Sequence, residues 1–317
     1  MPHLLQLIPE YHQRVWGGQR LRPSENPIGE AWLVYERNRI ANGPFAGRTL
    51  AEVAAELGTT LLGETAVART GTRFPLLIKL LDCADWLSVQ VHPNDEQAIQ
   101  LEGPGQFGKT EAWHILDADD RARLIAGVKP GIPPEALAVA IRNGTILDHV
   151  QYHPVHTGDT FFVPAGTLHA LGPGLLLYEV QQTSDITYRV FDWNRPASAG
   201  RAMHIEQAVA VTDAGAAGQR RPLPALKAHD RQELATCPYF TLELLTTQAE
   251  PFSLDTHRQS FHALTVVAGQ AEVEGGGERV TLPRFESVIV SASAGGYSIR
   301  PLSPCRLLKA SVEAGPI

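Results

Sequence analysis

Short apolar runs, separated by turn-forming residues, dominate the pattern of hydrophobic and polar positions along this chain. The 28 glycines and 23 prolines interrupt the sequence often. Runs rich in Val, Ile, Leu, Phe and Tyr between such breaks are typical of β-strands. We expect strands at residues 74–81, 87–91, 160–163, 175–181, 239–245, 262–267 and 287–290.

Helical patterns are fewer. Apolar residues recur at helical spacing in 50–62, and Asn94 is a good N-cap for a helix over 94–101. The segment 133–150 opens with prolines suited to a first helical turn and has a break near Asn143, and 203–211 is a further short helix. The pattern predicts a mainly β protein of the jelly-roll or sandwich class with a few covering helices.

The length of 317 residues suggests two domains. A stretch rich in Gly, Ala, Arg and Pro at 213–225 is typical of a linker. We therefore predict a catalytic domain over 1–212, with a small helical insertion near 133–150, and a second β domain over 226–317. The second domain has a similar strand rhythm but lacks the histidines and glutamate described below, so we interpret it as a degenerate copy of the first.

Charge and composition exclude several classes of partner. The formal net charge is −7, without long runs of one sign, which argues against nucleic acid and anionic membranes as partners. The chain has neither a signal-peptide pattern nor an apolar window of about 20 residues. Its three cysteines are widely spaced, as in reduced cytosolic proteins. We expect a soluble, cytoplasmic protein.

Four residues of the first predicted domain are candidate metal ligands. Gln90 and His92 lie two positions apart, so on a strand they face the same side. Glu111 supplies a carboxylate, with Lys109 two residues before it, and His169 follows a turn. Two imidazoles, a carboxylate and an amide oxygen are a plausible ligand set for a divalent metal, zinc above all.

The second histidine lies within a recognisable motif. The pattern Gly158-x5-Pro164-x-Gly166-x2-His169 matches the second cupin motif, whose glycines and proline allow a tight turn that directs the histidine into a barrel. The first cupin motif is altered, because Gln90 replaces its first histidine and the glutamate is displaced to Glu111. This change leaves the jelly-roll prediction intact and reduces the number of cupin families to which the chain can belong.

Several segments resemble type I phosphomannose isomerases, particularly the short bacterial form. The matching segments are VWGGQRL, GEAW, FPLLIKLLD, LSVQVHPND, GKTEAWHIL, PAGTLHALGPG and YEVQQTSDITYRVFDWNR. The resemblance implies two cupin-type jelly-roll domains, one Zn²⁺ per chain, and interconversion of mannose 6-phosphate and fructose 6-phosphate. It implies that Gln90, His92, Glu111 and His169 bind zinc and that Arg189 is catalytic. Lys109, Lys79, Glu179 and Asp185 are expected in the same pocket.

Aldose–ketose isomerisation needs a base, stabilisation of an enediolate and a grip on the distal end of the sugar. The base stays open between Glu179, Lys109 and a water on the metal. We expect Arg189 near the end of a strand that starts at Glu179. Trp16, Lys79, Lys109 and Arg189 are candidate substrate-binding residues. Trp16 could instead be a core aromatic, and Lys79 could pair with Asp82 or Asp85.

The sequence departs from the family after GEAW. Family members usually continue there towards a serine and a histidine, whereas this chain has Leu33-Val-Tyr-Glu-Arg37. This change concerns the choice of substrate rather than the reaction. Whether the natural sugar is phosphorylated stays open from the sequence. Two further readings stay open, an iron-dependent oxygenase of the cupin class and a non-catalytic sugar-binding cupin. The expected partner is a small sugar phosphate, and the chain is expected to be a monomer or homodimer.

Overall fold

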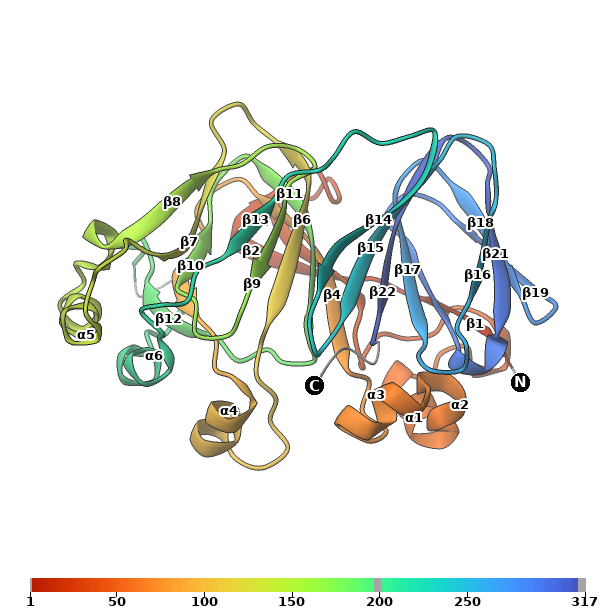
Figure 1. The fold of residues 1–317 in the computed structure, drawn as a ribbon, viewed down its shortest axis with the longest axis horizontal. Coiled ribbons are helices and arrows are strands. Elements are labelled where there is room, and N and C mark those ends of the chain that lie inside the picture. Colours follow the sequence, from red (N-terminus) through yellow and green to blue (C-terminus); the bar gives the residue numbers. More distant parts are fainter. Residues whose placement is uncertain (1, 197–200, 313–317) are drawn as a thin grey trace. The chain divides into compact units, whose positions relative to one another are not determined.

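A computed structural model describes residues 2–196 and 201–312 of the chain (Figure 1). The described residues form two compact units. One, here called the central unit, contains residues 11–31 and 80–222. The other, the C-terminal unit, combines residues 223–312 with two earlier segments, 2–10 and 32–79.

The central unit is built on two sheets. The first has the strand order β12-β5-β10-β7-β8 and the second has the order β13-β9-β6-β11-β4-β2-β3. Strands β2, β3 and β4 each have residues in both units. The strands are β2 (Glu10–Gly18), β3 (Ile28–Val34), β4 (Leu76–Cys83), β5 (Val89–Val91), β6 (Glu111–Ala118), β7 (Arg123–Val128), β8 (Val150–Pro154), β9 (Thr160–Val163), β10 (His169–Leu171), β11 (Leu175–Gln182), β12 (Tyr188–Phe191) and β13 (Gln219–Arg221).

The C-terminal unit is also a pair of antiparallel sheets, with the orders β1-β20-β17-β22-β15-β14 and β16-β21-β18-β19. The strands are β1 (Leu4–Leu7), β14 (His229–Thr236), β15 (Thr241–Thr247), β16 (Phe252–Asp255), β17 (His262–Ala268), β18 (Ala271–Gly275), β19 (Glu278–Leu282), β20 (Ser287–Val290), β21 (Gly296–Pro301) and β22 (Cys305–Ser311).

Short helices accompany the sheets. They are α1 (Leu50–Leu57), α2 (Thr59–Leu62), α3 (Glu64–Thr70), α4 (Asp95–Glu102), α5 (Pro134–Asn143) and α6 (Ile205–Val211), with single 3-10 turns at Gly43–Phe45, Ile146–Asp148 and Ala292–Ala294. Asn94 caps α4 as expected, with its side chain accepting from the backbone N–H of Gln97. No helix among residues 2–196 and 201–312 is long and apolar enough to cross a bilayer.

The predicted mainly β fold is confirmed, and each strand and helix expected from the pattern is present, within a few residues at the ends. The helix expected over 50–62 is divided at Gly58, which has a φ of 51°. The helical insertion at 133–150 ends with Gly144 in the left-handed conformation, followed by a 3-10 turn.

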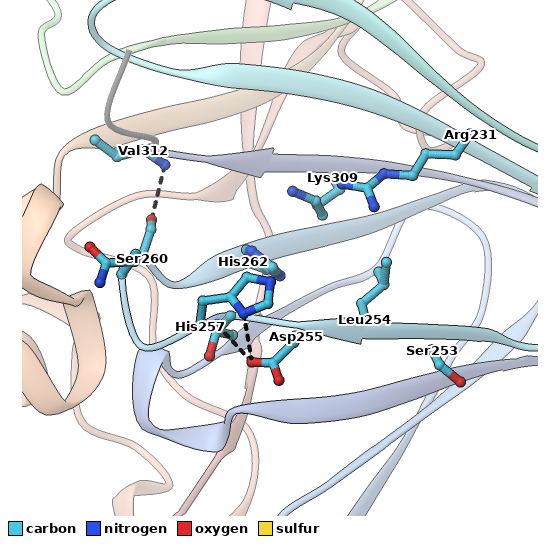
Figure 2. Close-up of a pocket in the computed structure, with 11 residues that line it drawn as sticks. Arg231, Ser253, Leu254, Asp255, His257, Ser260, His262, Lys309 and Val312 are labelled. Carbon is cyan, nitrogen blue, oxygen red and sulfur yellow. Dashed lines mark hydrogen bonds and ion pairs between the residues drawn. The ribbon is translucent and has the colours of Figure 1, made fainter. Parts of the chain in front are cut away.

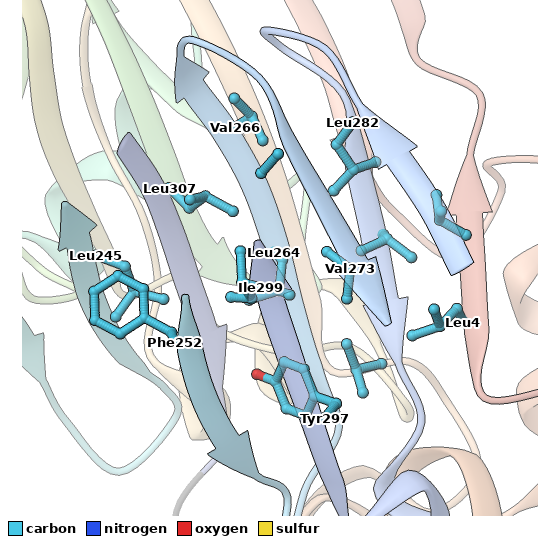
Figure 3. Close-up of a cluster of buried hydrophobic side chains, with 14 of the residues drawn as sticks. Leu4, Leu245, Phe252, Leu264, Val266, Val273, Leu282, Tyr297, Ile299 and Leu307 are labelled. Atoms are coloured by element: carbon cyan, nitrogen blue, oxygen red, sulfur yellow. The ribbon is translucent and has the colours of Figure 1, made fainter. Parts of the chain in front are cut away.

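Each sandwich has its own apolar core. In the C-terminal unit, Leu245, Leu264 and Leu307 of the six-stranded sheet pack with Val273 and Ile299 of the other sheet (Figure 3). In the central unit the same kind of core joins the two sheets through Trp113, Phe161, Leu177, Leu124 and Leu171. A second cluster packs α5 and α6 against the five-stranded sheet. Alternate residues of β7 and β10 enter different clusters, because successive side chains of a strand point to opposite faces of the sheet.

The compact units do not follow the predicted boundaries at 212 and 226. β1 pairs with β20 of the C-terminal unit because Leu4, Leu5 and Leu7 are buried there. The predicted linker at 213–225 contains β13, which pairs with β9. That one domain is catalytic and the other accessory remains a prediction, and it concerns the location of the active site.

Candidate metal centre

Two strands of the five-stranded sheet and one strand of the opposite sheet bring three ligand-type side chains together. His92 directly follows β5, His169 begins β10, and Glu111 begins β6. Each of these side chains is almost fully buried. One ligand atom from each lies within 4.8 Å of the other two.

Backbone carbonyls orient both imidazoles. His92 Nδ1 lies 2.8 Å from the carbonyl oxygen of Ile186, and His169 Nδ1 lies 2.9 Å from that of Thr167. Because a carbonyl only accepts, each Nδ1 carries the proton and each Nε2 presents a lone pair. The Nε2 atoms lie 3.7 Å (His92) and 3.3 Å (His169) from the carboxylate oxygens of Glu111.

Gln90 stands beside this group. It is the cross-strand partner of His169 in the β5–β10 ladder, and its Nε2 lies 3.3 Å from His169 Nε2. Rotation of the terminal amide presents its carbonyl oxygen at the same place. Gln90 is thus positioned as the predicted fourth donor.

Lys109 brings a positive charge into the same group. Its Nζ lies 2.9 Å from Glu111 Oε2 and 3.0 Å from His92 Nε2, and its side chain is buried. Burial lowers the pKa of His169 to about 4, with the Lys109 cation adding to this, while the hydrogen bond to Thr167 and the charge of Glu179 act in the opposite direction. At neutral pH the His169 imidazole is therefore neutral, as metal coordination requires.

Glu179 lies one strand further along the second sheet. β11 pairs Glu179 with Trp113 of β6, and the Trp113 indole N–H donates to Glu179 Oε2 over 3.0 Å. The Trp113 ring packs edge-on to the His169 ring, with centroids 5.4 Å apart. The sequence reasoning did not single out Trp113, although strand alternation places it on the same face as Glu111.

Arg189 is not on the strand that contains Glu179, and that expectation was wrong. β11 ends at Gln182, the chain turns, and Arg189 lies on β12 as the cross-strand partner of Gln90. The turn forms because the Gln181 amide donates to the backbone carbonyls of Gln182 and Ser184.

The half-buried Arg189 guanidinium donates to Ser88 Oγ over 3.1 Å and to the Ala202 carbonyl over 2.7 Å. Burial lowers its pKa. Arg201 also donates to Ser88 Oγ, over 3.2 Å, which adds a second cation that the sequence reasoning missed. Asp185 lies exposed in the turn before β12, and the structure records no contact between it and the metal-ligand candidates within the described residues.

Two candidate substrate-binding residues have other evident contacts. Trp16 is buried in the core of the central unit, the alternative that the sequence had left open. Lys79 is buried in the C-terminal unit, and its Nζ lies 5.2 Å from the centroid of the Trp32 ring. Asp82 forms an ion pair with Arg20, and Asp85 forms one with Arg195.

The segment that departs from the family pattern also lies in the C-terminal unit. Glu36 forms an ion pair with Arg73 over 2.9 Å, and the Arg37 guanidinium lies over the Tyr35 ring. These contacts give the segment a packing role.

The donor set fits a zinc ion. Two Nε2 lone pairs, a buried carboxylate and an amide converge, and each imidazole is oriented through its other nitrogen, as in known zinc sites. Among the described residues, His92, Glu111 and His169 are the one group of at least three histidine, cysteine or acidic side chains close enough to share an ion.

Comparisons with known proteins identify relatives of this chain. The family model for the catalytic domain of type I phosphomannose isomerase matches residues 4–109. The chain is 35% identical over 312 residues to a mannose-6-phosphate isomerase of Streptococcus mutans, covering 92% of this chain and 93% of that protein.

Among solved structures, the Bacillus subtilis mannose 6-phosphate isomerase superposes with a TM-score of 0.86 at 28% identity, covering 98% of this chain and 99% of that one. A zinc-bound mannose 6-phosphate isomerase shares the fold, with a TM-score of 0.74 at 18% identity and coverage of 98% and 99%. The extent of these matches, together with the fold, shows that the chain belongs to the type I phosphomannose isomerase family.

Proposed function

We propose that this chain is a zinc-dependent aldose–ketose isomerase that interconverts mannose 6-phosphate and fructose 6-phosphate through an enediolate intermediate. One zinc ion per chain would be held by Gln90, His92, Glu111 and His169. The observation that carries the proposal is the convergence of two imidazole Nε2 atoms on Glu111, with each imidazole oriented by a backbone carbonyl. The names of the relatives supply the reaction and the substrate.

Zinc in such a site acts as a Lewis acid toward the oxygens of the reacting carbons. The protein's own cations then stabilise the negative charge that develops during enolisation. Lys109 is held at the site by Glu111 and His92. Arg189 is fixed by Ser88 and Ala202 and stays protonated near neutral pH, so its forked donors suit an enediolate.

Three candidates for the base that moves the proton between C1 and C2 stay open, namely Glu179, Lys109 and a water on the metal. Glu179 has one carboxylate oxygen held by Trp113, and Lys109 lies against the metal ligands. Exchange of the C2 hydrogen of mannose 6-phosphate with deuterated solvent distinguishes them. A variant that removes the base loses exchange and turnover together, and exchange retained in both the Glu179 and the Lys109 variant would indicate the water.

The proposal also covers the partner, the oligomeric state and the cellular location of the enzyme. Its partner is a small sugar phosphate rather than nucleic acid or a membrane, and it acts as a monomer or homodimer in the cytoplasm. The three cysteines are free, with Cys83 and Cys305 buried, which supports a reducing compartment.

Metal analysis combined with a turnover assay tests the proposal. The purified protein is expected to contain one zinc per chain and to convert mannose 6-phosphate faster than free mannose. His169→Ala should lose the metal. Iron with oxygen uptake would indicate a cupin oxygenase, and sugar binding without turnover would indicate a binding protein. A full metal complement in His169→Ala would refute the ligand assignment.

A further inference from the structure

Arg189 meets the residue that precedes α6 through both of its backbone polar groups. The Arg189 N–H donates to His204 Nδ1 over 3.3 Å, and the Arg189 carbonyl accepts from the His204 N–H over 2.9 Å. β12 is the first strand in the order of its sheet, so within residues 2–196 and 201–312 no further strand pairs with its outer side. His204 therefore satisfies backbone groups that a neighbouring strand would otherwise satisfy.

The same segment also binds the Arg189 side chain. The guanidinium donates to the Ala202 carbonyl over 2.7 Å and to Ser88 Oγ over 3.1 Å. Arg189 is the cross-strand partner of Gln90, so the two side chains lie on the same face of the sheet. A shift of the Arg189 backbone would therefore move the guanidinium relative to the candidate metal ligands.

The side chain of His204 is used in an unusual way for its place in the chain. His204 is the N-cap residue of α6, a position where Ser, Thr, Asp or Asn usually accepts a hydrogen bond from the first helical turn. The His204 side chain makes no such bond. Its ring lies beside β12 instead, with its centroid 6.1 Å from that of the Tyr188 ring. The side chain thus serves the strand rather than the helix.

The helix gives this contact a fixed support. Ala208 and Val211 of α6 are buried in a cluster with Val89 of β5 and Val190 of β12. Successive residues of a strand point to opposite faces, so Val190 packs in this cluster while the Arg189 side chain lies on the other face. Packing of α6 against the sheet therefore holds its N-terminal end beside β12.

The imidazole of His204 can accept a hydrogen bond at Nδ1 only while that nitrogen is unprotonated. Burial lowers the pKa of His204, the positive charge of Arg189 lowers it further, and Glu102 acts in the opposite direction. At neutral pH the ring is therefore neutral and able to accept from the Arg189 N–H.

We propose that His204 is a positioning residue, which fixes the backbone of Arg189 so that the guanidinium is held beside the metal centre. The observation that carries this inference is the pair of hydrogen bonds between the two residues. The inference rests on the proposed function, in which Arg189 stabilises the enediolate. Within the described part of the chain, no recorded interaction of His204 reaches a candidate metal ligand, so its effect is expected through Arg189.

Steady-state kinetics of the zinc-loaded full-length protein with mannose 6-phosphate test the inference. His204→Ala removes the acceptor and should lower kcat by about tenfold, because a displaced guanidinium keeps its charge but meets the enediolate poorly. KM should change by less than about twofold, since the enediolate charge develops only in the transition state. His204→Asn offers its side-chain oxygen near the place of Nδ1 and should recover kcat to within about threefold of the wild type.

Amide hydrogen exchange gives a readout that does not depend on turnover. The Arg189 N–H is bonded to His204 Nδ1, so its exchange should accelerate by about tenfold in His204→Ala and return toward the wild-type rate in His204→Asn. The amides of β5, which lies on the other side of β12, should change much less.

A double variant separates positioning from a general effect on the fold. The combination of Arg189→Ala with His204→Ala should be no slower than Arg189→Ala alone, because no guanidinium remains to be positioned. A residue that only stabilised the fold would lower kcat in both backgrounds.

His262→Ala is the matched control in the other unit. His262 is buried, its Nδ1 lies 2.8 Å from the Tyr297 hydroxyl, and Figure 2 shows it among the residues that line a cavity of the C-terminal unit. The change removes a buried imidazole and its hydrogen bond without touching Arg189. We expect this variant to keep the wild-type kcat, whatever its effect on thermal stability.

The inference is overturned if His204→Ala keeps the wild-type kcat, if His204→Asn is as slow as His204→Ala, or if the double variant is about tenfold slower than Arg189→Ala. A wild-type protein that binds zinc but does not convert mannose 6-phosphate would instead refute the proposed function. In that case the Arg189 amide still decides whether His204 holds the backbone, and equal exchange in the wild type and His204→Ala would show that it does not.

Discussion

The imidazoles of His92 and His169 illustrate how backbone atoms prepare side chains for chemistry. Each ring donates through Nδ1 to a carbonyl, so neither ring can turn its Nε2 away from Glu111 without losing a buried hydrogen bond. Lys109 adds a cation in contact with two of these residues. The two imidazoles are therefore oriented before a metal arrives, which lowers the cost of binding it.

Arg189→Ala should separate metal binding from turnover. The Arg189 guanidinium is held by Ser88 and Ala202 and is not one of the candidate ligands. We expect the variant to keep its zinc and to lose turnover by at least about a hundredfold, the scale of one donor to a developing oxyanion. Metal content and kcat are measured on the same sample, and unchanged kcat would contradict the role. The conservative Arg189→Lys should recover only part of the activity, because a single ammonium cannot replace the fork.

His262 should make the stability of the protein depend on pH. Its pKa is about 2 in the folded protein and near 6.5 when unfolded, so between these values the unfolded chain binds the extra proton. Stability from this residue is present above about pH 6.5 and falls as the pH decreases. Between about pH 7.5 and 5.5 the loss should be about 1.3 kcal/mol.

Urea unfolding in phosphate-free buffer at these two pH values measures the effect. His262→Gln should lose that part of the pH dependence, whereas His257→Gln, whose side chain is 80% exposed, should behave as the wild type. Tyr297, Lys309 and Arg231 surround His262, and the pKa of Glu243 is lowered, so that carboxyl titrates below this window. Equal pH dependence in all three proteins would refute the assignment.

At the scale of elements, the turn before β10 determines where His169 lies. Gly166 has a φ of 84°, and its backbone N–H donates to the His92 carbonyl over 2.9 Å. The turn thus connects the segments that contain the two histidines. A Cβ at Gly166 would lie 3.3 Å from both the Val211 carbonyl oxygen and Asp213 Cβ.

Gly166→Ala should therefore cost both stability and metal affinity. Strain at a positive φ is worth about 1–3 kcal/mol. Gly131 has nearly the same φ, 83°, but no atom within 4 Å of an added Cβ. Gly131→Ala should lose comparable stability and keep its zinc affinity, as measured by competition with a chromogenic chelator. If the two variants bind zinc equally well, the turn does not position the ligand.

The sequence predicted those elements whose signal is local. Alternation placed Gln90 and His92 on one face, and the glycine–proline motif located the turn before His169. The break between β11 and β12 was missed because it depends on the Gln181 side chain reaching the carbonyls of Gln182 and Ser184. The pairing of β1 with β20 was missed for a similar reason, since it joins residues almost the whole chain apart.

At the scale of the molecule, two sandwiches of the same general plan differ in what fills one part of their interior. The central unit presents neutral imidazoles and a carboxylate, which suit a metal ion. The C-terminal unit presents Lys309 and Arg231, which both form ion pairs with Glu243. The sequence reasoning did not predict this buried ionic group, because its cations lie on separate strands far apart in the chain.

Removal of the metal should affect the two units differently. His92, Glu111 and His169 all belong to the central unit, and an ion bound there at a thousand times its dissociation constant stabilises the folded state by about 4 kcal/mol. Local openings that separate β5, β6 and β10 destroy the site, so in the zinc-loaded protein they are suppressed by that amount. After chelation, amide hydrogen exchange should accelerate in these three strands. Exchange in β15, β17 and β22, which contain no candidate ligand, should change much less. An equal acceleration in both sets of strands would mean that the metal stabilises the whole chain cooperatively. The location of the metal in one unit would then not explain which amides are protected from exchange.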